Sequence, residues 1–257
     1  MQWQATKFIS LKAGRRYAGI SAVNAMHLAD FDFSTKPRIF TMYYGDNHGL
    51  AIDGLSLKLE QSFGNSNISL ENEWGKNSIH RNTGQLSSTL RYQYENDKNI
   101  IDARIYGYFD YQNAPENKLL NLFDAADYYS LQPSNAFEMN AKGASLSYNY
   151  ILSDQKNLLL HAELMTRKIG KKSYMGGFAY LQAQFSEKWN ASIMYQELKV
   201  PFFENSLLNA YSERITTLGI SYEPNENQRI RLEYSNTNNN PFYDNMLLLK
   251  YRVYVNI

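Results

Sequence analysis

Four histidines are the first candidates for chemistry in this chain: His27, His48, His80 and His161. No two of them have a metal-ligand spacing on one strand face, and the chain contains no cysteine. Imidazole and thiolate metal sites are therefore not expected. The chain also lacks Gly-x-Ser-x-Gly, His-Glu-x-x-His and a phosphate-cradling glycine loop, which mark hydrolases, metalloproteases and nucleotide-binding proteins. We expect no enzymatic activity, no metal and no cofactor.

Three weaker groups of residues could in principle carry chemistry. Asp46-Asn47-His48 could form an acid–base cluster, but a solvated loop turn explains the same residues. Asp124 and Asp127 could bind a hard cation with backbone carbonyls, and an ordinary acidic loop is the simpler interpretation. An outer-membrane lipid hydrolase would need a serine beside a histidine on the outer surface, and His161 has no serine two residues away.

Charged residues at alternate positions of extended segments form a larger constellation. If the first and last strands of a closed barrel are neighbours, their basic side chains form one wall, faced in part by Glu60 and its acidic neighbours. Charges on opposite walls of a water-filled pore sort solutes by charge. Alternatively, Arg and Glu pair across neighbouring strands and simply satisfy a polar interior. The residues expected to line the pore are Lys12, Arg16, Glu71, Glu73, Arg91, Arg104, Arg229, Arg231, Lys250 and Arg252.

The elements that must position these residues are segments in which apolar and polar residues alternate. In the last one, Leu247, Leu249, Tyr251 and Val253 share one face, whereas Lys250 and Arg252 share the other. Successive side chains of a strand point to opposite faces, so such a strand separates an apolar medium from water. Twelve strands are predicted, at about 7–16, 53–62, 67–75, 86–95, 100–111, 142–152, 157–167, 173–185, 189–197, 213–223, 228–236 and 245–256.

The connectors between these segments are short and long by turns. Short polar turns such as Asn96-Asp97-Lys98-Asn99 alternate with longer connectors, of which 17–52 and 112–141 are the longest. This pattern is typical of an antiparallel up-and-down transmembrane β-barrel with short periplasmic turns, long extracellular loops and both termini in the periplasm. The first long connector could fold inward as a constriction or plug carrying Asp32, Arg38 and Asp46, or it could cap the outside.

Composition agrees with one outer-membrane domain spanning residues 1–257. No linker or change of composition divides the chain, and the formal net charge of +1 argues against nucleic acid as a partner. Mean hydropathy is −0.52, which a barrel tolerates because only alternate residues face lipid. The 21 tyrosines suit interfacial girdles, for which Trp74, Trp189, Tyr94, Tyr150 and Tyr222 are candidates at strand ends. A soluble β-sandwich or small soluble barrel, with the charged face outside, stays open.

Two regions resemble the phosphate-selective porin (O and P type) superfamily and its porin relatives. The first holds Leu11-Lys-Ala-Gly-Arg15, Asn24, Phe33, Pro37-Arg38, Tyr43-Tyr44-Gly45-Asp46, Gly49-Leu50 and Asp53-Gly54-Leu55-Ser56-Leu57. The second holds Tyr180-Leu-Gln-Ala-Gln-Phe185, Trp189, Ser221-Tyr-Glu-Pro224, Arg229-Ile-Arg-Leu-Glu-Tyr234 and the final strand.

The chain departs from that family in two respects, its start and its end. Such porins usually start well upstream of the KAGR-like strand and end in Phe, whereas this chain ends at Ile257. No signal peptide is visible at Met1. The resemblance therefore implies a shortened member or a section of a larger barrel, with its leader removed.

The sequence thus leads to one main functional hypothesis. We expect a passive outer-membrane channel for small hydrophilic solutes, mildly preferring anions, surrounded by outer-membrane lipid and lipopolysaccharide and assembled as a homotrimer. The alternative is a non-conducting barrel that acts as an anchor or scaffold, or binds a glycan, phage or partner protein at the cell surface.

Overall fold

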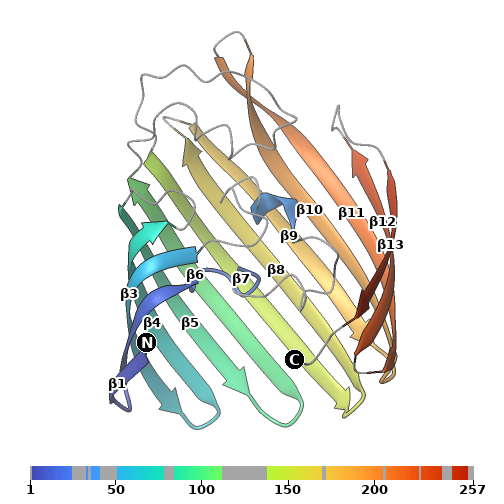
Figure 1. The fold of residues 1–257 in the computed structure, drawn as a ribbon, viewed down its shortest axis with the longest axis horizontal. Coiled ribbons are helices and arrows are strands. Elements are labelled where there is room, and N and C mark those ends of the chain that lie inside the picture. The colour runs from blue at the N-terminus through green and yellow to red at the C-terminus, as the bar shows by residue number, and fades with distance from the viewer. Residues whose placement is uncertain are drawn as a thin grey trace.

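The computed structural model describes residues 2–24, 33, 36–40, 51–77, 84–111, 138–169, 172–204, 207–225, 227–238 and 245–253. In these parts of the chain, 13 strands form one sheet in sequence order, each antiparallel to the next, and the sheet curls around a central space (Figure 1). The strands are β1 (Gln2–Thr6), β2 (Ile9–Tyr17), β3 (Ala51–Phe63), β4 (Ser66–Asn77), β5 (Gly84–Glu95), β6 (Asn99–Tyr111), β7 (Glu138–Ser153), β8 (Lys156–Ile169), β9 (Lys172–Gln184), β10 (Trp189–Glu204), β11 (Leu207–Asn225), β12 (Gln228–Asn238) and β13 (Met246–Val253).

The twelve predicted strands correspond to β2–β13, and the sequence analysis missed β1. This strand has five residues and pairs with β2 alone, so it is too short to show a clear alternation. The connector expected at 198–212 is also mostly strand, because β10 and β11 stay paired from Leu198↔Glu213 to Glu204↔Leu207. Hydrogen bonding between two strands continues wherever register allows, with no need for a lipid-facing pattern in the side chains.

The short turns close as their polar residues predict. Asn96 Oδ1 accepts the backbone N–H groups of Lys98 at 3.0 Å and Asn99 at 2.7 Å, which fixes the turn between β5 and β6. Ser186 Oγ accepts the backbone N–H of Trp189 at 3.1 Å in the turn between β9 and β10. In both of these turns, a polar side chain therefore helps to fix the register of the hairpin that the turn closes.

The two faces of the sheet are those of a membrane barrel. Leu55 is 60% exposed, Ile105 65% and Leu249 70%, whereas Glu73 and Glu163 on the opposite face are each 1% exposed. A soluble sandwich or soluble barrel would bury the leucines and expose the glutamates. Such an outward apolar band is stable only against an apolar medium. The fold is therefore of the antiparallel transmembrane β-barrel type, and the soluble alternatives are wrong.

Aromatic residues gather at the turn end of the barrel wall, as expected. Trp189 and Tyr222 are opposite each other in register, and their ring centroids lie 4.6 Å apart. No helix in the described ranges has both the length and the apolar character needed to cross a membrane.

The two ends of the sheet are not joined among the described strands. Hydrogen bonding runs from β1 to β13, and these two edge strands lie on opposite sides of the curled sheet in Figure 1. The condition that the first and last strands are neighbours is therefore not met among the described strands. Lys12 and Arg16 on β2 therefore do not lie beside Lys250 and Arg252 on β13. The order of the strands in the sheet determines which side chains are neighbours, and side-chain alternation within a strand does not encode that order.

Candidate functional site

The first long connector enters the barrel and fills part of its interior. We call its described residues, 18–24, 33 and 36–40, the lumenal segment. Ile20, Val23, Ile39 and Phe40 are fully buried, and Phe33 is 1% exposed. They pack with inward side chains of the strands in one buried cluster. The connector was expected either to fold into the barrel or to cap its outside, and its described part lies inside. Asp32 and Asp46 lie outside the described residues.

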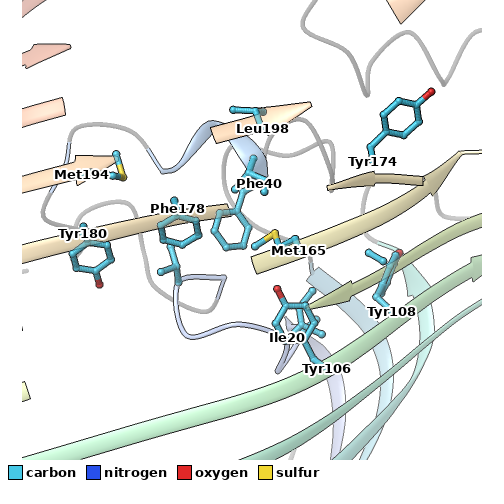
Figure 2. Close-up of a cluster of buried hydrophobic side chains, with 14 of the residues drawn as sticks. Ile20, Phe40, Tyr106, Tyr108, Met165, Tyr174, Phe178, Tyr180, Met194 and Leu198 are labelled. Carbon is cyan, nitrogen blue, oxygen red and sulfur yellow. The ribbon is translucent and has the colours of Figure 1, made fainter. Parts of the chain in front are cut away.

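Apolar contacts hold the lumenal segment against β8, β9 and β10. The rings of Phe40 and Phe178 lie edge to face at 5.8 Å, and those of Phe33 and Tyr180 at 5.9 Å. Figure 2 shows Phe40 beside Phe178 and Met165, with Leu198 close by. This patch of the inner wall is apolar, whereas the sequence analysis expected a polar lumen throughout. The missed signal is β9, where inward Phe178 and Tyr180 alternate with outward Ala179 and Leu181.

Two buried carboxylates of the wall fix the start of the lumenal segment. Glu73 on β4 accepts the backbone N–H of Gly19 at 2.8 Å, the hydroxyl of Ser87 at 2.6 Å and Arg16 Nε at 3.0 Å. A carboxylate has about four lone-pair sites, so this one is well satisfied by three donors. The predicted pore-lining pair Arg16 and Glu73 is thus an anchor for the lumenal segment.

Glu163 on β8 is the second anchor. It accepts the hydroxyl of Ser21 at 2.6 Å and the phenol of Tyr106. Arg104 on β6 donates from Nη1 to the carbonyl of Ser21 at 2.9 Å. Ser21 has a φ of 57°, a left-handed conformation that is uncommon for a residue other than glycine. Bonds from two strands hold Ser21 in place and offset the strain of this conformation.

Arg38, which the sequence analysis assigned to a constricting loop, fixes the far end of the lumenal segment. Its Nε lies 3.2 Å from a Glu213 oxygen on β11, and its backbone N–H donates to Gln196 Oε1 on β10 at 2.7 Å. Glu213 is fully buried. The sequence analysis missed Glu213 and Gln196, although both have the parity of inward residues on their strands.

His161 lies inside the barrel in a row of three polar side chains. Its Nδ1 is 2.6 Å from Ser147 Oγ on β7, and its Nε2 is 3.4 Å from a Glu163 oxygen. The search for a serine along the histidine's own strand missed Ser147, which is its cross-strand neighbour in register. The imidazole is fully buried and stacks on Tyr180 at 5.1 Å. The row faces the lumen, so it does not form the outer-surface pair that a lipid hydrolase would need.

The predicted pore-lining residues of β2–β6 form ion pairs with one another or with Asp102 on the inner face. Lys12 Nζ is 3.5 Å from Glu71. Asp102 receives both Arg91 and Arg104, each at 2.7 Å. The pairing interpretation therefore describes this side of the wall, and Glu71 and Glu73 are engaged there rather than facing the basic residues of the last strands.

Four basic side chains have inward positions on β12 and β13. Arg229 is opposite Arg252 and Arg231 is opposite Lys250 in register. Glu223 lies 2.7 Å from Arg229, and Glu233 lies 3.7 Å from Arg231. We call this the basic ladder, and define it as Arg229, Arg231, Lys250 and Arg252. Like charges directly opposite each other destabilise a sheet, so this arrangement has an energetic cost that pairing in the rest of the wall avoids.

No group of three His, Cys, Asp or Glu side chains able to hold a metal ion occurs in the described ranges. The remaining candidates from the sequence lie outside those ranges: His27, His48, His80, Asp124 and Asp127.

The architecture places the chain among outer-membrane β-barrels. No protein-family model matches it, and no curated protein does. Among solved structures it is similar to a loop L8 deletion mutant of OmpT, an outer membrane protein of Vibrio cholerae: TM-score 0.61, 11% identity, over 96% of this chain and 76% of the other. It is also similar to a trimer form of in-vitro folded OmpT: TM-score 0.54, 11% identity, over 90% and 67%. These likenesses concern the fold. They do not support the phosphate-selective porin family in particular.

Proposed function

We propose that the protein is a passive outer-membrane channel for small hydrophilic solutes with a mild preference for anions. The observation that carries this proposal is the basic ladder on the inner face of β12 and β13. Positively charged side chains on a wetted wall raise the local concentration of anions and lower the barrier to their passage. Covalent chemistry has no role in this proposal, and neither does a metal or a cofactor.

The lumenal segment sets the width of the proposed channel. It is held by Glu73, Glu163 and Glu213 and packs on the aromatic patch of β8–β10. The basic ladder lies on β12 and β13, which follow β11, the strand that holds Arg38 through Glu213. Solutes that cross the proposed channel would therefore pass the lumenal segment and meet the positive charge of the ladder.

Planar bilayers with a salt gradient test the proposal. Replacement of Arg229, Arg231 and Arg252 by Glu should shift the reversal potential toward cation selectivity, with open channels in both proteins. A Gln triple variant at the same positions should give an intermediate value and carries less risk to folding. Lys188→Glu, in an exposed short turn, is the matched control and should behave as the wild type. Unchanged selectivity in both triple variants would remove these residues from the conduction path.

The second candidate is a non-conducting barrel that anchors, scaffolds or binds a partner at the cell surface. Occupation of the interior by the lumenal segment favours it, because buried apolar contacts there leave less room for solute. The two candidates separate in the same assay, since a closed barrel gives no single-channel conductance in the wild type.

Assembly and orientation complete the proposal. We infer short turns and both termini on the periplasmic side and long connectors outside, as the length pattern favours. A homotrimer surrounded by outer-membrane lipid and lipopolysaccharide is the expected state, and one similar solved structure is described as a trimer. The mass of the detergent-solubilised complex tests the assembly, and protease access from either side of the membrane tests the orientation.

A further inference from the structure

His161 lies where two kinds of contact hold the lumenal segment. Its Nε2 is 3.4 Å from Oε2 of Glu163, and the same oxygen accepts the hydroxyl of Ser21 at 2.6 Å. Its ring lies against those of Phe178 and Tyr180, with centroids at 5.4 and 5.1 Å. The lumenal segment packs its own aromatic side chains on these two rings. His161 therefore touches both the carboxylate and the aromatic contacts that hold the segment.

The hydrogen bonds of His161 can be kept in either charge state of its ring. In the neutral imidazole that suits these contacts, Nδ1 accepts the hydroxyl of Ser147 at 2.6 Å and Nε2–H points to Glu163. In the imidazolium both nitrogens donate, and the hydroxyl of Ser147 turns to accept. Ser147 is an inward residue that is only partly buried, so the row has a side toward the lumen. Protonation therefore needs no rearrangement of the wall.

The surroundings of His161 decide how a positive charge on its ring is received. The inward residues beside it on β7 and β10 are uncharged: Ser145, Ser147, Met194 and Gln196. The titratable and charged residues on the other elements packed around it are Asp102, Arg104 and Tyr106 on β6, Glu163 and Arg167 on β8, Tyr174 and Tyr180 on β9, and Lys36 and Arg38 of the lumenal segment. Arg104 binds Asp102, and Arg38 binds Glu213. Glu163 lies within ion-pair distance of His161.

A positive charge on His161 stabilises the packed state of the lumenal segment. Glu163 is 1% exposed and His161 is fully buried. The donors to Glu163 from Ser21 and Tyr106 are neutral hydroxyls. A buried carboxylate is costly without an opposite charge beside it, and attraction between two charges is strongest where water is excluded.

Two effects oppose this gain: desolvation of the imidazolium and repulsion from Arg104. We expect the attraction to Glu163 to exceed them, because the carboxylate is buried in both charge states of His161 and Arg104 already shares its charge with Asp102. Cations are also attracted to aromatic rings such as those of Phe178 and Tyr180. If the segment leaves, water reaches the pair and the attraction falls.

We propose that protonation of His161 tightens the hold on the lumenal segment, so that the channel narrows in acid and widens as the pH rises. Imidazole is the side chain whose charge ordinarily changes between about pH 5 and 8. By linkage, a state that gains from the proton is favoured at the acid end of this range and loses that advantage as the pH rises through it. The effect on conduction rests on the proposed function, whereas the effect on the segment does not.

Hydrogen exchange of the full chain in non-ionic detergent tests the switch without need of conduction. After correction for the pH dependence of chemical exchange, amides of residues 18–24 should be at least about fivefold better protected at about pH 5 than at about pH 8, the lower end of the usual coupling between two binding events. Amides of β5 and β6 are the internal reference and should change much less. In planar bilayers, conductance and its noise should be lower at the acid pH.

Variants of His161 separate its protonation from a general effect of pH. His161→Gln keeps hydrogen-bonding groups and His161→Phe keeps the aromatic contact, and both should lose the difference between the two pH values. Glu163→Gln should lose it too, because the proton then gains no charged partner. Joint replacement of His27, His48 and His80, the other histidines of the chain, by Gln is the matched control and should keep the difference.

The proposal is overturned if the wild type is equally protected at both pH values, or better protected at the higher one. A pH response that survives in a folded His161 variant overturns it as well, and so does its loss in the control variant. A protein without conductance that keeps the pH-dependent protection would refute the channel and leave the switch in place. A conducting protein without that protection would do the reverse.

Discussion

Phe40→Ala tests whether packing of the lumenal segment controls the width of the pore. Phe40 is fully buried and its ring meets Phe178 edge to face at 5.8 Å. Replacement of a buried phenylalanine by alanine costs about 3–5 kcal/mol, and each 1.4 kcal/mol is a tenfold change in an equilibrium constant. The packed state should therefore lose at least about 100-fold against a state in which the segment leaves the wall.

Two measurements on Phe40→Ala test this prediction. Single-channel conductance should rise and become noisier, and backbone amides of residues 18–24 should exchange hydrogen faster, while amides of the strands keep their protection. Phe185→Ala is the matched control, because Phe185 is 48% exposed beside a short turn. If conductance and exchange in Phe40→Ala equal those of the wild type, the aromatic contacts do not hold the segment and the reasoning fails.

Three more predictions address the anchors, the wall and the fold. Glu163→Gln should weaken the hold on Ser21 and increase conductance noise. Ser147→Ala should change the noise much less, because the hydroxyl of Ser147 bonds His161 on β8 rather than the lumenal segment. Asp102→Asn should lower the free energy of unfolding in urea by about 1–3 kcal/mol, since it removes the acceptor of two arginines; Glu197→Gln, in an exposed pair, should cause no measurable loss. Unheated protein in detergent should migrate differently from boiled protein on a gel, and identical migration would count against a closed, stable barrel.

Local alternation was sufficient to predict most of the wall. Twelve of the strands and their outward faces follow from a period of two, because each strand must separate lipid from water by itself. Leu164, Ile193 and Leu218, for example, could be assigned outward without knowledge of any neighbour. The prediction failed where a strand need not separate lipid from water along its whole length. Strand β1 is too short to show a period of two, and β10 and β11 continue beyond the ranges predicted for them.

The sequence analysis located the charged residues of the site and left their partners open. It placed Arg16, Glu73 and Arg104 on the inner face and expected Arg38 in a constriction, but it could not pair Arg38 with Glu213 or His161 with Ser147. Those pairs join residues that are distant along the chain, and register between strands brings them together. The apolar patch of Phe178 and Tyr180 was missed for a related reason, because its partner is the lumenal segment.

By itself, then, the sequence determined a series of strands with one apolar and one ionic face and favoured a membrane barrel, since side-chain alternation is a local property of each strand. The tertiary structure decided which charges cancel, what occupies the interior and which strands lie side by side. The basic ladder of β12 and β13 is positive because its registered partners are also basic, and the acidic residues of β4 already bind Arg16, Lys12 and the lumenal segment. The electrostatic potential at a point in the interior depends on the distances between charges on different strands. Those distances are set only once the sheet has formed.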